Sequence, residues 1–92
     1  MILEYKSGHP TVPYVIVGKG FPRSVHYSVT RATVPTAHIH FLFEERESTK
    51  LAQYTISAYN GGVITKGTYL GSVTQRNGKL LHYFYEKTEV KE

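Results

Sequence analysis

The chain has 92 residues, a formal net charge of +4, 40% hydrophobic residues, and no cysteine, tryptophan or aspartate. This length and composition correspond to one folded domain over residues 1–92. The missing cysteine and aspartate exclude a disulfide framework, a zinc finger and a Ser-His-Asp triad. Neither a signal peptide nor a bilayer-spanning stretch is present, and no motif indicates a cofactor, so we expect a soluble, cytoplasmic protein.

The first third of the chain reads as short strands separated by prolines. All four prolines lie within the first 35 residues, which disfavours a long early helix. Residues 14–17, 25–33 and 38–43 are rich in Val, Ile, Tyr, Phe and Thr and therefore predict strands. Residues 18–22 (Gly-Lys-Gly-Phe-Pro) predict a turn or loop, and their glycine spacing does not match a phosphate-binding loop.

The second half of the chain predicts a meander of three strands from Ala52 to Thr88. Residues 52–58 alternate strictly between inward and outward types, as in a half-buried strand. A short helix over residues 48–59 is the alternative, and at most one short helix near residues 45–52 is expected. The pairs Asn60-Gly61 and Asn77-Gly78 each predict a tight hairpin with a two-residue turn.

These two hairpin registers assign each side chain to one of two faces, because successive side chains of a strand alternate. The predicted core face contains Ala52, Tyr54, Ile56, Ala58, Val63, Tyr69, Val73, Leu80 and Phe84. The opposite face is predicted to carry tyrosines and cations: Tyr59, Lys66, Arg76, Lys79, Tyr83 and Tyr85. The predicted fold is thus all-β and mainly antiparallel, a small barrel or strongly curved sheet of about six or seven strands. Its free edges favour a homodimer.

This basic tyrosine face is the predicted binding site. Residues 5–43 and 48–85 together carry eight lysines and arginines and no carboxylate. Aromatic rings stack on bases while cations contact phosphates, so we expect a non-enzymatic binding protein for single-stranded nucleic acid. The alternative is a protein-binding effector or inhibitor, of the size made by phages and mobile elements, that docks an acidic protein surface through the same face or through residues 44–50. A purely structural role for the tyrosines is the third interpretation.

The histidines suggest a further hypothesis, a metal or catalytic site. His38 and His40 are two residues apart and share one side of a strand, where Glu44 and a neighbouring His26 would complete a metal-ligand set. Without a metal, imidazoles including His82 would suit general acid–base cleavage of RNA. Solvent-facing histidines that alternate with core residues explain the same pattern.

Overall fold

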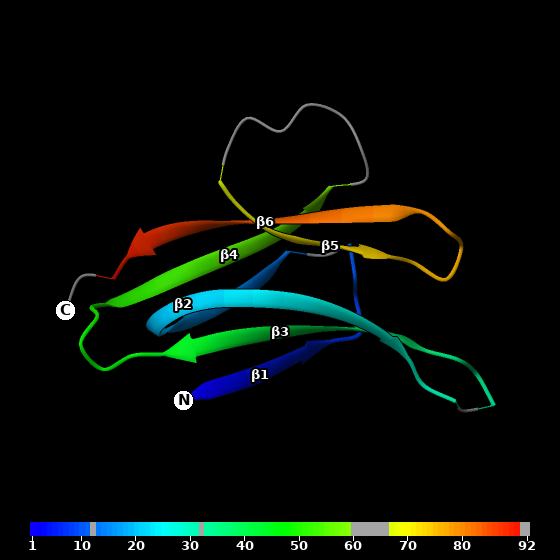
Figure 1. The fold of residues 1–92 in the computed structure, drawn as a ribbon, viewed down its shortest axis with the longest axis horizontal. Coiled ribbons are helices and arrows are strands. Elements are labelled where there is room, and N and C mark those ends of the chain that lie inside the picture. Colours follow the sequence, from blue (N-terminus) through cyan, green and yellow to red (C-terminus); the bar gives the residue numbers. More distant parts are fainter. Residues whose placement is uncertain (12, 32, 60–66, 91–92) are drawn as a thin grey trace.

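A computed structural model describes residues 1–11, 13–31, 33–59 and 67–90. These residues form one sheet of six antiparallel strands in the order β1-β3-β2-β4-β6-β5, with no helix among them (Figure 1). The prediction of an all-β fold built on a strongly curved sheet is confirmed. The described part of the chain contains no helix long and apolar enough to cross a membrane. The strands are β1 (Ile2–Ser7), β2 (Tyr14–Val29), β3 (Ala37–Glu45), β4 (Leu51–Tyr59), β5 (Thr68–Thr74) and β6 (Leu80–Glu89).

Strand β2 belongs to both halves of the sheet. Its first part, from Tyr14 to Lys19, pairs with β4, and its second part, from Gly20 onward, pairs with β3. At this point the strand turns back on itself, and the sheet folds over (Figure 1). We call the β1-β3-β2 half sheet A and the β2-β4-β6-β5 half sheet B. The predicted turn or loop at residues 18–22 is wrong, because these residues remain paired within β2 and their glycines and proline mark a bend and a bulge.

Gly20 sits at this bend and contacts both halves. Its φ is +141°, and a Cβ at this position would overlap the main-chain oxygen of Glu44 on β3. Its own carbonyl accepts a hydrogen bond from the buried Tyr54 hydroxyl on β4. Only glycine tolerates this combination of backbone conformation and close approach.

The core fills the space between the two halves. Phe41 on β3 meets Tyr83 on β6 edge-on, with ring centroids 5.7 Å apart, and Phe43 meets Tyr54 in the same way at 5.6 Å. The inward positions of β4 are as predicted, since Ala52, Tyr54 and Ile56 are all buried, and the helix proposed for residues 48–59 does not form. The other buried apolar residues are Ile16, Val25, Ile39, Val73 and Leu81.

The last three strands are neighbours, but their order differs from the predicted meander. Strand β6 lies between β4 and β5, whereas the prediction placed β5 in the middle. Two side chains of β6, Leu81 and Tyr83, are buried, against one of β5, Val73. The strand that buries more apolar surface therefore takes the interior position, and β5 becomes an edge. The predicted Asn60-Gly61 turn, Val63 and Lys66 lie outside the described residues.

The β5–β6 hairpin forms with a three-residue loop instead of the predicted two. Thr74 pairs with Leu80, and the Gln75 N–H donates to the Lys79 carbonyl at 2.8 Å, so the loop is residues 76–78. Gly78 closes it with φ +85°, the left-handed conformation that three-residue hairpin loops need. The extra residue shifts the register by one, which turns every side chain of β6 to the opposite face relative to β5.

We expect Gly20→Ala to lower the free energy of unfolding by about 2 kcal/mol or more, because the new Cβ meets the Glu44 main chain in a strained conformation. Urea titration followed by circular dichroism measures this change. Gly8→Ala is the matched control, since a Cβ there meets no atom within 4 Å and should change stability little. Equal stability of the two variants would contradict the assigned role of Gly20.

Candidate functional site

The three tyrosines of the predicted binding face do not share one surface. Tyr59 lies on the outer face of sheet B and is 38% exposed. Tyr83 is 2% exposed, and its hydroxyl donates to the Pro10 carbonyl at 2.8 Å. Tyr85 packs against the core and meets Tyr54 edge-on at 5.8 Å. The prediction that Tyr83 and Tyr85 face outward is wrong, because the three-residue loop turns them inward.

The predicted cations are also dispersed. Arg76 lines a pocket between the tips of two hairpins, and Lys79 is exposed just after the β5–β6 loop. Lys66 lies outside the described residues, so its place relative to the sheet is not described. Of the six predicted contact residues, Tyr59 is the one that the structure places among other exposed rings.

Four rings gather on the outer face of sheet B, and we call them the outer aromatic cluster: Tyr59, Tyr69, His82 and Phe84. Phe84 lies between the two tyrosines, with ring centroids 5.7 Å from Tyr59 and 5.1 Å from Tyr69. The Tyr69 hydroxyl lies 3.3 Å from the His82 Nδ1 atom. Strand pairing brings them together, because Tyr59 lies opposite His82 and Tyr69 lies opposite Phe84.

The sequence prediction assigned Tyr69 and Phe84 to the core. Both face outward for reasons of register: the loop of residues 76–78 turns Phe84 outward, and an irregularity between Tyr69 and Gly71 does the same for Tyr69, which is 52% exposed. The glycine after Asn77 was the available signal, since it permits a three-residue loop as well as a two-residue turn.

Exposed aliphatic residues extend the cluster across the same face. Val15 and Val17 on β2 lie opposite Thr55 and Gln53 of β4, and about half of each valine side chain is exposed. Leu80 at the start of β6 is similarly exposed. The outer face of sheet B therefore exposes aromatic and aliphatic side chains among the polar residues of the same strands.

A small hollow in this face holds one carboxylate. Thr55, Ser57, Tyr59, Phe84 and Glu86 surround a volume of about 240 Å³. Within the described ranges, the ion pairs of glutamates are those of Glu4 and Glu44, and Glu86 forms none there. Two rings beside a carboxylate that has no ion pair among the described residues are suited to a cationic group, through cation–π attraction and ion pairing.

The outer face of sheet A is ionic and internally paired. Glu44 accepts hydrogen bonds from Arg23 at 3.0 Å and from Arg46 at 2.9 Å. The bond from Arg46 lowers the pKa of the Glu44 carboxyl, and the charge of Arg23 adds to this effect. Two largely exposed guanidinium groups thus bind one carboxylate, and exposed ion pairs of this kind add little to the free energy of folding.

The predicted metal candidates do lie on this outer face of sheet A. His26 lies opposite His40 across β2 and β3, and His38 and Glu44 occupy the same side of β3. No group of three His, Cys, Asp or Glu in the described part of the chain could hold a metal ion. Burial lowers the pKa of His38, and its buried Nδ1 atom has no hydrogen-bond partner.

His40 joins three strands through hydrogen bonds. Its Nε2 lies 2.6 Å from the Ser28 hydroxyl on β2, and its Nδ1 lies 3.2 Å from the Glu4 carboxylate on β1. A Ser-His-Glu series of this kind can activate a nucleophile when a substrate pocket adjoins it. Neither the hollow at Glu86 nor the pocket at Arg76 includes these residues, and the two contacts of His40 link β1, β3 and β2 on this face.

The chain matches no protein-family model, no curated protein and no solved structure. The outer aromatic cluster is the candidate functional site, because its chemistry differs from that of an ordinary solvated face. It combines exposed rings and valines with a carboxylate that has no ion pair among the described residues. Exposed aromatic and aliphatic side chains that gather on one face are typical of interaction sites.

Burial raises the pKa of the Tyr83 hydroxyl to about 12, and Tyr27 adds to the shift. A folded-state pKa above the unfolded value means that the unfolded chain loses this proton first as pH rises. The protonated Tyr83 hydroxyl therefore makes its full contribution to the free energy of unfolding below about pH 10. This contribution is lost as the pH rises toward about 12.

We expect Tyr83→Phe to lower the free energy of unfolding by about 1 kcal/mol at neutral pH, because the hydrogen bond to Pro10 is lost. The variant should then lose less stability than the wild type between about pH 9 and pH 11.5. Burial also raises the pKa of Tyr54, so the stability of the variant should still fall with pH, but less steeply than that of the wild type. Urea midpoints across this range measure both effects, and identical slopes would contradict the assignment.

Proposed function

We propose that this chain is a non-enzymatic binding protein that docks a protein partner through the outer face of sheet B. The observation that carries the proposal is the outer aromatic cluster, in which Tyr59, Tyr69, His82 and Phe84 lie together on an exposed sheet face. Aromatic residues are enriched and charges depleted at the centre of protein interfaces. The half-exposed Val15 and Val17 enlarge the apolar area that a partner would bury.

The hollow at Glu86 supports a specific partner chemistry. A lysine or arginine of the partner would lie beside the Tyr59 and Phe84 rings, in the hollow that they line, and pair with the Glu86 carboxylate. The partner is thus a protein surface on which apolar side chains surround one cation. Burial of that ion pair among aromatic rings gives specificity, since a partner without the cation would leave Glu86 desolvated and unpaired.

Single-stranded nucleic acid is the second candidate partner. The exposed Tyr59 and Tyr69 rings could stack on bases, and the net charge of +4 favours a polyanion. The position of Glu86 on this face disfavours phosphates, and Arg76 lines a pocket instead of the face. The protein partner therefore has the stronger support.

The first test compares Tyr59→Ala with Phe21→Ala. Phe21 is a matched control because its ring is 37% exposed, close to the 38% of Tyr59, but lies on sheet A. With each protein as bait in lysate of the cells that make it, wild type and Phe21→Ala should retain the same partner. Calorimetry with that purified partner should show Tyr59→Ala weakening binding by roughly thirtyfold, as expected for an interface hot spot. Equal affinity of both variants would contradict the proposal.

Glu86→Gln separates the two candidate partners. The variant removes the one carboxylate of the hollow, so it should weaken binding of a cation-bearing protein by about tenfold or more. If the partner is nucleic acid, Glu86→Gln should instead strengthen binding, because the substitution removes a negative charge that repels the phosphates. Fluorescence anisotropy of labelled single-stranded DNA and RNA at about 50 and 200 mM salt measures this alternative. Salt-sensitive binding that strengthens in Glu86→Gln would replace the protein partner with nucleic acid.

A further inference from the structure

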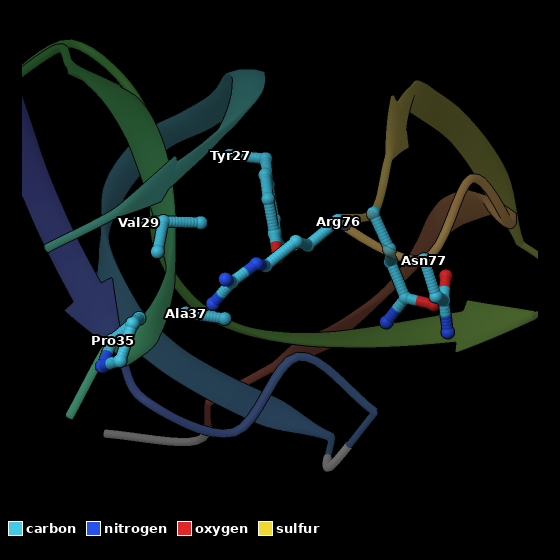
Figure 2. A pocket seen from close by; sticks show the side chains of 7 residues that line it. Tyr27, Val29, Pro35, Ala37, Arg76 and Asn77 are labelled. Carbon is cyan, nitrogen blue, oxygen red and sulfur yellow. Dashed lines mark hydrogen bonds between the residues drawn. The ribbon is translucent and has the colours of Figure 1, made fainter.

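A second pocket lies where the tips of two hairpins meet. The β2–β3 hairpin contributes Tyr27, Val29, Pro35 and Ala37, and the end of the β5–β6 hairpin contributes Gln75, Arg76 and Asn77 (Figure 2). This pocket has a volume of about 500 Å³ and is broadly open to solvent. The pocket shares no residue with the outer aromatic cluster, so its function is independent of the proposed docking face.

Arg76 supplies the charge of this pocket. Figure 2 shows its side chain reaching from the loop toward Tyr27 and Ala37. Its backbone N–H donates to the Tyr27 hydroxyl at 3.2 Å, which ties the loop of sheet B to sheet A. No glutamate lines the pocket, and in the described ranges the arginines that form ion pairs are Arg23 and Arg46. The guanidinium therefore has both its position and its charge available for an anion.

The remaining lining residues form two unlike walls. Val29, Pro35 and Ala37 provide an apolar wall, whereas Gln75 and Asn77 provide amides. The Asn77 Oδ1 atom accepts a hydrogen bond from the Lys79 N–H at 2.9 Å, which leaves the amide N–H donors of Asn77 for other contacts. The lining is thus suited to a ligand that combines an apolar body, hydrogen-bonding groups and a negative group.

We infer that this pocket binds a nucleoside monophosphate. The planar guanidinium of Arg76 matches two phosphate oxygens, a geometry that a lysine would not reproduce. The base would lie against Val29, Pro35 and Ala37, while the amides of Gln75 and Asn77 would bond its donor and acceptor edge. Arg76, which the sequence prediction assigned to a nucleic-acid face, thus recognises a phosphate in a pocket instead.

Isothermal titration calorimetry of the full chain with AMP tests this inference. Adenosine and inorganic phosphate serve as partial ligands, and each should bind at least about tenfold more weakly than AMP. Arg76→Gln should weaken AMP binding by about ten- to a hundredfold, because charge-assisted hydrogen bonds to the phosphate are lost. Lys50→Gln is the matched control, since it removes one positive charge from a residue that does not line the pocket.

Ala37→Leu provides a second variant with unchanged charge, and it should weaken AMP by filling the apolar side of the pocket. Circular dichroism establishes that each variant is folded. The inference is supported if Arg76→Gln and Ala37→Leu lose affinity for AMP while Lys50→Gln retains it. It is overturned if wild type shows no saturable AMP binding, if phosphate alone binds as tightly as AMP, or if the two charge variants lose affinity equally.

Discussion

The fold depends on the bend of one strand at Gly20. There β2 leaves its pairing with β4 and begins its pairing with β3, so the two halves of the sheet face each other across the core. The bend is possible because Gly20 has no side chain to meet the Glu44 main chain, and the Tyr54 hydroxyl secures its carbonyl. Without the bend, Phe41 and Phe43 could not meet Tyr83 and Tyr54, and the core would lie open to water.

The bend also determines where the functional surfaces lie. Because the inner faces of both halves are covered by each other, an interaction surface must lie on an outer face or where hairpin tips meet. The two outer faces carry different side chains. On sheet A, Glu44 pairs with Arg23 and Arg46, whereas sheet B exposes aromatic rings near Glu86. The Tyr27 hydroxyl accepts a hydrogen bond from the Arg76 backbone N–H. This bond connects the ends of the two hairpins beside the pocket.

The fold class was predictable from the sequence because strand composition and alternation are local signals. The alternation over residues 52–58 correctly separated the inward Tyr54 and Ile56 from the outward Thr55. Prediction from the sequence failed where one local signal has two meanings. Glycine and proline at residues 18–22 indicate a loop as readily as a bend inside a paired strand. The order of β5 and β6 depends on how much apolar surface each strand buries, which is a property of the whole core.

The candidate site was harder to predict, because the face of every β6 side chain relative to β5 depends on one loop residue. The pair Asn77-Gly78 is compatible with loops of two or three residues, and the third residue exchanges Tyr83 for Phe84 on the outer face. Surface chemistry in such a hairpin changes in two unequal ways during evolution. A substitution alters one position, whereas deletion of one residue from the loop would exchange a whole row of side chains between interior and surface. Selection should therefore act on the length of the loop at residues 76–78 as strictly as on the glycine at position 78.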